Sequence, residues 1–334
     1  MLKRFIFPLF LLTVVVSLVG TSYAIVAPAA PSGPSVRPPV AYKQIIRPAG
    51  PLVFQAEWGG YIRNNQHVNF DTPSDMSLQA GRLYILDPVN HSVAILSVDG
   101  TAHGAITSDQ IGGSSAGVAA DNSGRLYVAN ASYAITRAFR VTGVLATQFG
   151  SNGQIGSEGQ GLGDENRGWG KTTTDSNDEV YICDPNNTKV KKFFKNGAFA
   201  GEIGGPNQLT VRLTSAKDVV YSGAGGEYIY IASGQSIRKI STAFDSNAVN
   251  NSTDFVTGLE FCNLITARGN YIFIMDNNII KKLNMSGQVV WTYNGQGDGE
   301  GMYSDPAAIE VDKDGNVYVL DKGQNKVIKY TQAQ

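Results

Sequence analysis

The sequence predicts an all-β chain folded as a six-bladed β-propeller with four-stranded antiparallel blades. Two observations carry this prediction, a short apolar segment that recurs six times and the regular distance between its copies. The 334-residue chain also contains 38 Gly and 15 Tyr. That composition suits many short strands joined by tight turns.

The recurring segment is an aliphatic residue, an aromatic residue, an aliphatic residue and a further apolar residue. Successive copies are 43, 54, 49, 43 and 45 residues apart, which is the length of a four-stranded blade. A strand with one face in water alternates apolar and polar residues, whereas these segments are apolar on both faces. We therefore expect neighbouring blades to cover each segment on both sides. The copies are residues 83–86, 126–129, 180–183, 229–232, 272–275 and 317–320.

The last repeat predicts how the first and last blades are joined. After its inner strand, apolar strand and third strand, the sequence ends one strand short of a complete blade. Residues 52–60 resemble the fourth-strand segments at 143–150 and 287–295. We expect this N-terminal strand to complete the last blade and close the ring, which removes exposed sheet edges.

The stretch from Asp305 to Tyr330, DPAAIEVDKDGNVYVLDKGQNKVIKY, resembles an NHL repeat. Ala308 stands where that family usually has Gly, and Lys326 where Arg is common. The other copies match less well, but the resemblance extends over residues 52–334. It implies an NHL-type propeller, a family made up chiefly of ligand-binding and protein-binding platforms with a minority of enzymes.

The first 24 residues have the pattern of a signal peptide. Two basic residues precede an apolar run from Phe5 to Val19, and small residues around Tyr23 match a cleavage site. An uncleaved signal anchor is the alternative, because the apolar stretch continues through residues 5–27 toward the length of a bilayer span. Both alternatives place the repeats outside the cytoplasm, secreted or at the cell surface, with membrane contact only through residues 5–27 if they remain.

Residues 25–51 are predicted to be a linker ahead of the propeller. They contain seven of the 13 prolines, a composition typical of a semi-rigid extended spacer. The predicted organisation is therefore a leader at 1–24, a linker at 25–51 and a propeller at 52–334.

Charge argues against a nucleic-acid partner. The chain has 27 basic and 28 acidic side chains, and loss of the leader would remove two of the basic ones. Such a surface does not attract nucleic acid by its overall charge. Basic pairs such as Lys191 and Lys192 recur in the third strands, and we expect them on a solvated face.

Two further features receive structural interpretations. Cys183 and Cys262 fall in the third and fifth repeats, so we expect two buried thiols in blades too far apart for a disulfide. An aspartate follows the apolar segment in four repeats, where its carboxylate can bond the backbone of the next turn. These aspartates are Asp87, Asp184, Asp276 and Asp321.

The candidate binding site is one mouth of the axial channel, where the first residues of the inner strands converge. Several of these residues are polar where the NHL pattern expects Gly. Residues 151–170 form a long Gly-rich loop that could bring an Arg and a Trp onto this rim, although the Trp could equally wedge between blades. The predicted rim residues are Asp75, Arg167, Trp169, Lys171, Asp218 and Asn263.

This rim predicts a non-catalytic module that binds a protein, peptide or glycan and needs no cofactor. The alternative is a calcium-dependent hydrolase or lyase, because the site resembles six-bladed lactonase-type enzymes whose metal is held by acidic and amide side chains at the same mouth. Asp75, Asp218 and Asn263 would then supply calcium ligands, although the ammonium of Lys171 would repel the ion. All three histidines fall inside the first repeat, which argues against a zinc site shared between blades.

Overall fold

The computed structural model describes residues 50–151, 153–155, 169–205, 213–244 and 252–333. The predicted leader, nearly all of the linker and Arg167 therefore lie outside the described residues. Over the described ranges the chain forms strands and turns without a helix, and so without a helix suited to crossing a membrane.

Four sheets have four antiparallel strands each, as the repeats predict. One contains β4 (Asp75–Gln79), β5 (Arg82–Asp87), β6 (Ser92–Ser97) and β7 (Ala102–Thr107). The next contains β8 (Ser115–Ala120), β9 (Arg125–Asn130), β10 (Ile135–Arg140) and β11 (Gln154–Ile155). The third contains β12 (Thr172–Thr174), β13 (Val180–Asp184), β14 (Lys189–Phe193) and β15 (Phe199–Gly204).

The fourth of these sheets joins the two ends of the propeller. It contains β1 (Leu52–Trp58), β24 (Lys326–Gln332), β23 (Val317–Asp321) and β22 (Pro306–Val311), in that order. Strand β1 runs antiparallel to β24, with Leu52 opposite Gln332 and Trp58 opposite Val327. The predicted pairing of the N-terminal strand with the last repeat is confirmed. A hairpin of β2 (Gly60–Arg63) and β3 (Gln66–Asn69), which the repeats do not predict, follows β1.

The fourth and fifth repeats share one six-stranded sheet, so the prediction of six separate sheets is wrong: the described residues form five blade-type sheets. The reason is that two long strands each replace a pair of short ones. The first half of β17 pairs with β16 and its second half with β18. Strand β18 leaves β17 at Cys262 and continues along β19, without a turn between them. The strands are β16 (Asp218–Ser222), β17 (Tyr228–Ser241), β18 (Thr253–Arg268), β19 (Tyr271–Asp276), β20 (Ile279–Asn284) and β21 (Val289–Tyr293).

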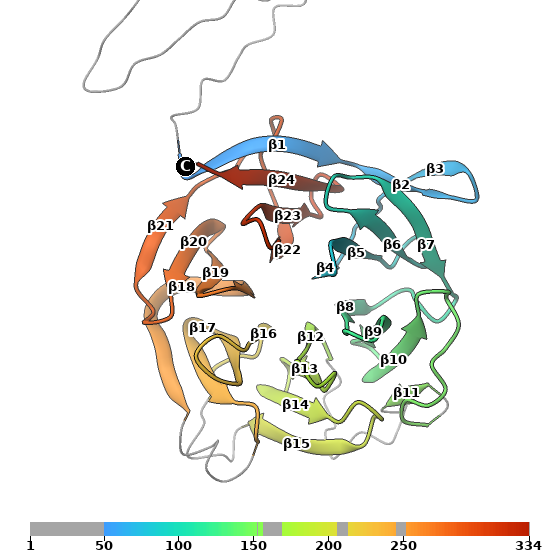
Figure 1. Cartoon of the computed structure of the whole chain (residues 1–334), viewed down its shortest axis with the longest axis horizontal. Helices are drawn as coiled ribbons and strands as arrows, with labels where there is room; N and C mark the ends of the chain where they lie inside the picture. The colour runs from blue at the N-terminus through green and yellow to red at the C-terminus, as the bar shows by residue number, and fades with distance from the viewer. Residues whose placement is uncertain (1–49, 152, 156–168, 206–212, 245–251, 334) are drawn as a thin grey trace, which may run out of the picture. The chain divides into compact units, whose positions relative to one another are not determined.

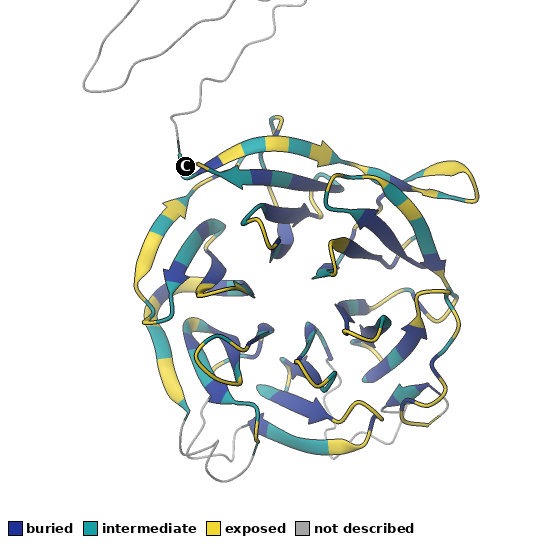
Figure 2. Cartoon of the chain, viewed as in Figure 1, coloured by how far each residue is buried: buried dark blue, intermediate teal, exposed yellow. Residues whose placement is uncertain are grey.

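The sheets stand around a central opening with their innermost strands toward it (Figure 1). Each innermost strand contacts the next, in the order β22, β4, β8, β12, β16, β18 and β22 again. The apolar repeat segments lie one strand farther out and are buried (Figure 2). Leu83 of β5 and Tyr318 of β23, for example, belong to one core cluster between two sheets. This arrangement confirms that neighbouring sheets cover both faces of the repeated segment.

The interpretation of the cysteines is confirmed, and that of the repeated aspartates is confirmed for Asp184 and Asp321 but not for Asp276. Asp184 accepts the Asn187 N–H at 3.3 Å, whereas Asp276 accepts the Phe261 N–H of the preceding strand at 2.7 Å. Cys183 and Cys262 are buried and free. Asp321 accepts hydrogen bonds from the Asp305 N–H at 2.9 Å and from the Gly323 N–H at 3.0 Å.

The prediction for the basic pairs is wrong for Lys191 and Lys192, which are 1% and 6% exposed. Lys191 pairs with the Asp184 carboxylate at 3.1 Å, and Lys192 with that of Glu179 at 2.5 Å. Burial of the Lys191 ammonium on β14 is tolerated because Asp184 neutralises it.

A buried aspartate–tyrosine hydrogen bond recurs at the turn before the apolar strand. The tyrosine of the repeated segment donates its hydroxyl to an aspartate six residues earlier, at 2.9, 2.9 and 2.8 Å in the three pairs. The pairs are Asp121 with Tyr127, Asp175 with Tyr181 and Asp312 with Tyr318. In the fourth repeat Ala224 stands in place of the aspartate, and the buried Tyr230 hydroxyl has no partner among the described residues.

The two kinds of tyrosine provide a matched test. Tyr318→Phe removes a buried hydrogen bond and should lower the free energy of unfolding by about 1 kcal/mol. Tyr230→Phe removes a hydroxyl without a partner, so it should leave stability unchanged or raise it slightly. Denaturant unfolding of both variants checks this, and equal losses in the two would contradict the assigned role of the aspartate.

Candidate functional site

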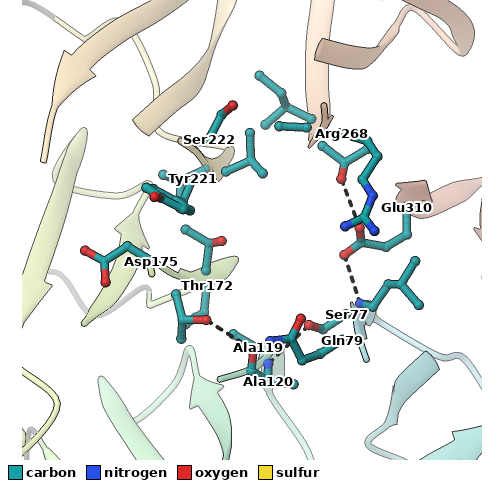
Figure 3. A pocket seen from close by; sticks show the side chains of 18 of the residues that line it. Ser77, Gln79, Ala119, Ala120, Thr172, Asp175, Tyr221, Ser222, Arg268 and Glu310 are labelled. Atoms are coloured by element: carbon teal, nitrogen blue, oxygen red, sulfur yellow. Dashed lines mark hydrogen bonds between the residues drawn. The ribbon is translucent and has the colours of Figure 1, made fainter. Parts of the chain in front are cut away.

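A pocket of about 580 Å³ lies on the axis of the propeller, between the six innermost strands. Its walls come from β4, β8, β12, β16, β18 and β22 (Figure 3). Asp75 and Asp218, the first residues of β4 and β16, lie at one end. The side chains at the other end are exposed and include Asn122, Arg268 and Asn270. We call this exposed end the open mouth.

Carboxylates in the wall bond the backbone of the neighbouring innermost strand. Alternate N–H groups of an innermost strand point toward the axis, where no further strand can pair with them. Asp75 Oδ2 accepts the Val118 N–H at 2.8 Å, and Asp218 Oδ2 accepts the Ile265 N–H at 2.9 Å. Each contact links one innermost strand to the next one around the axis.

Glu310 of β22 makes the same kind of link. Its Oε1 accepts the Leu78 N–H of β4 at 3.3 Å, and its Oε2 accepts the Thr266 hydroxyl of β18 at 2.9 Å (Figure 3). The residue therefore connects β22 to both of its neighbours. The carboxylate is held by two neutral donors that come from different strands.

Lys171 spans the end of the pocket opposite the open mouth. Its Nζ donates to the Asp75 carboxylate, to the Ala307 carbonyl at 2.6 Å and to the Ser74 carbonyl at 3.3 Å. Lys171 immediately precedes β12, which lies opposite β22 in the cyclic order of innermost strands. The side chain therefore crosses the axis, and all three N–H groups of its ammonium have acceptors.

Burial changes the acidity of the wall carboxylates. Desolvation raises the pKa of Asp218 to about 7, against the lowering effect of the Lys171 ammonium. Desolvation also raises the pKa of Glu310 to about 8, against the hydrogen bond from Thr266. Desolvation raises the pKa of Asp75 as well, and the Lys171 ammonium offsets part of that rise. The pocket thus holds carboxyl groups that gain or lose a proton near neutral pH.

The structure brings three of the predicted rim residues together, namely Asp75, Lys171 and Asp218. Trp169 is 2% exposed and packs on Phe193 with ring centroids 5.8 Å apart, so its ring is wedged in the core and not presented to a ligand. Asn263 does not line the pocket, and its buried Oδ1 has no partner among the described residues. Arg167 lies outside the described residues.

The geometry does not favour the calcium alternative. Both carboxylate oxygens of Asp75 are already engaged, by Lys171 and by the Val118 N–H. Asn263 is absent from the wall, which leaves the predicted ligand set incomplete. Within the described ranges, no three His, Cys, Asp or Glu side chains come close enough to hold a metal ion.

Sequence reasoning missed Glu310 and the open mouth. Glu310 stands within AAIEV, at a position where the NHL pattern has Ala. A single acidic residue inside an otherwise apolar strand was the signal that could have found it, because a buried carboxylate needs specific partners. Arg268 ends its strand at a turn and carried no comparable signal.

The chain resembles solved β-propellers in fold. No protein-family model matches it, and no curated protein sequence matches it. Virginiamycin B lyase from Staphylococcus aureus is similar over 84% of this chain and 100% of its own, with TM-score 0.55 and 13% identity. A chain of the nidogen/laminin complex is similar over 73% and 92%, with TM-score 0.54 and 14% identity. The WD40 propeller domain of Doa1 is similar over 85% and 98%, with TM-score 0.53 and 12% identity. At these identities the comparisons show the propeller fold alone.

Replacing the lysine that crosses the axis should destabilise the propeller. Lys171→Met leaves the buried Asp75 carboxylate without its cation and should lower the free energy of unfolding by about 3 kcal/mol. Adding Asp75→Asn to that variant should restore part of the loss, since the uncompensated charge is then removed. Denaturant unfolding of both variants measures the effect. If Lys171→Met lowers the free energy of unfolding by less than about 0.5 kcal/mol, the Lys171–Asp75 pair contributes no more than an ordinary surface contact.

The raised pKa of Glu310 predicts a pH-dependent stability. The carboxyl has a pKa of about 8 in the fold and about 4.3 in an unfolded chain, so the fold favours its protonated form. The stabilisation of the fold by this protonated carboxyl is fully present below about pH 4 and is lost as the pH rises through 8. The free energy of unfolding of Glu310→Gln, relative to that of the native protein, should therefore rise by at least about 1 kcal/mol from pH 5 to pH 9. Unfolding free energies at the two pH values test this, and an unchanged difference would show that the carboxyl is solvated.

Proposed function

We propose that this chain is an exported, six-bladed, NHL-type propeller that binds a small polar ligand in its axial pocket without catalysing a reaction. The observation that carries the proposal is the polar pocket of about 580 Å³ between the innermost strands. Its volume lies in the range of small-molecule sites, which are usually concave and largely preformed.

The six-bladed closed ring is supported by contacts between strands. The innermost strands touch in a cycle of six, and β1 pairs with β24. The six-stranded sheet then corresponds to two blades that share the long strand β18, whose two halves pair with different neighbours. NHL character is supported by the match over residues 305–330, and export by the pattern of the first 24 residues.

The proposed ligand enters by the open mouth and not by the rim that the sequence suggested. Lys171 crosses the axis at that rim, held by acceptors from two other strands. At the opposite end, Asn122, Arg268 and Asn270 are exposed around the pocket. A binding role is preferred to a catalytic one because the wall carboxylates of Asp75, Asp218 and Glu310 already accept bonds that hold the strands together.

Blocking the open mouth tests the proposal. A library of polar small molecules is screened by thermal unfolding against the native protein and two variants. Asn122→Trp places a bulky ring at the mouth, and Thr292→Trp is a control on the exposed outer strand β21. At least one compound should raise the melting temperature of the native and control proteins by roughly 5 °C at saturating concentration, but not that of Asn122→Trp. Shifts that persist in Asn122→Trp, or a library without any shift, would contradict the proposal.

A further inference from the structure

Two carboxylates of the axial pocket, the buried Asp218 and the half-buried Glu310, lack a cationic partner among the described residues. Asp218 accepts only backbone N–H groups, from Val219 at 2.8 Å and from Ile265 at 2.9 Å. Glu310 accepts only from a backbone N–H and from the Thr266 hydroxyl. A carboxylate offers about four acceptor sites, so each group keeps capacity for a further donor.

Among the described residues, the ammonium nearest to these groups, that of Lys171, cannot serve them. Lys171 uses its three N–H groups on Asp75, Ser74 and Ala307. Within the described ranges, the pocket therefore places three carboxyl groups, those of Asp75, Asp218 and Glu310, against a single ammonium. An uncompensated negative charge away from water is costly, and a cation that entered the pocket would offset this cost.

A ligand ammonium suits this wall better than a metal ion does. The carboxylates are already positioned as hydrogen-bond acceptors for N–H and O–H donors. A bare metal ion would need six or more converging oxygens, whereas an ammonium needs about three acceptors. In the part of the chain that the structure describes, the acidic side chains form no metal-binding group.

The open mouth carries a positive charge on Arg268. The Asp175 carboxylate also lines the pocket near this end, but it is buried and already accepts the Tyr181 hydroxyl and the backbone N–H groups of Asn177 and Glu179. Arg268 is exposed there and has no ion-pair partner among the described residues. It lies two residues beyond Thr266 on β18, which corresponds to about 7 Å along a strand and to the same side of it. Figure 3 shows Arg268 and Glu310 in the pocket wall, from the contacting strands β18 and β22. A second positive group on the ligand would be repelled at the mouth, whereas a carboxylate would be attracted.

We infer that the ligand is a small zwitterionic amine of the amino-acid class. Its ammonium is bound by Asp218 and Glu310 inside the pocket, and its carboxylate faces Arg268 at the open mouth. The inference rests on the proposed function and specifies the chemistry of the same pocket.

Three related probes separate the contributions of the two charges. They are 4-aminobutanoate, butylamine, which lacks the carboxylate, and butanoate, which lacks the ammonium. Calorimetry on the full native protein at pH 9 should show 4-aminobutanoate binding best, butylamine roughly tenfold weaker and butanoate at least roughly a hundredfold weaker. Affinity for 4-aminobutanoate should fall from pH 9 to pH 6, because the wall carboxyls gain protons while the amine stays charged.

Variants assign the effect to residues. Glu310→Gln should weaken 4-aminobutanoate roughly tenfold, whereas Glu202→Gln on the outer strand β15 should not change its affinity. Arg268→Gln should abolish the preference for 4-aminobutanoate over butylamine and leave butylamine affinity unchanged. Arg268 is exposed, so Arg268→Gln should fold even if Glu310→Gln does not, and it then carries the test alone.

Three results would overturn the inference: butanoate binding as well as 4-aminobutanoate, affinity insensitive to Glu310→Gln and Arg268→Gln, or no binding by any of the three probes. The outcome of the library screen separates this failure from that of the proposed function. If library compounds still bind in a manner that Asn122→Trp abolishes, the pocket is a ligand site of another chemical class. If nothing binds in either experiment, both proposals fail.

Discussion

Each innermost strand carries backbone N–H groups on its axial side that no further strand can reach, because no strand lies between it and the axis. A buried N–H without an acceptor costs about as much as a lost hydrogen bond. In this protein, polar side chains of the preceding innermost strand supply the acceptors. Asp75 serves Val118, Asp218 serves Ile265 and Glu310 serves Leu78, and the Ser77 hydroxyl accepts the Ala120 N–H at 3.1 Å. The contacts run in one direction around the axis, so the requirement that each strand edge imposes also ties β22 to β4, β4 to β8 and β16 to β18.

The same requirement produces the chemistry of the pocket. Carboxylates are good acceptors for N–H groups, but several of them near one axis accumulate negative charge, which is costly where they are buried. Lys171 compensates part of that charge and crosses one end of the pocket in doing so. The remaining carboxyls, with the pKa of Asp218 near 7 and that of Glu310 near 8, are left with capacity for a positively charged group. Structural stability and the proposed ligand preference therefore depend on the same side chains.

The sequence predicted what the repeats determine and missed what single residues determine. Six apolar segments at blade spacing indicated the propeller, and residues 52–58 were correctly assigned to the last repeat because their pattern matches a fourth strand. The shared sheet of the fourth and fifth repeats was missed, since nothing in residues 253–268 marks where β18 changes partners. At the site, Asp75, Lys171 and Asp218 were identified as departures from the repeat. Whether Trp169 lies on the rim or in the core depends on three-dimensional packing that the sequence does not show. Glu310 was missed because it lies inside an otherwise apolar strand.

Native-state hydrogen exchange of the axial amides tests the central claim most directly. If side chains of the preceding strand hold these groups, the Val118 and Ile265 amides should exchange as slowly as core amides such as that of Val128 in β9, although they face the pocket. Slow exchange should persist until the propeller unfolds as a whole. Exchange of the Val118 and Ile265 amides at the rate of exposed turn residues such as Asn270 would show that the carboxylates do not tie the innermost strands together.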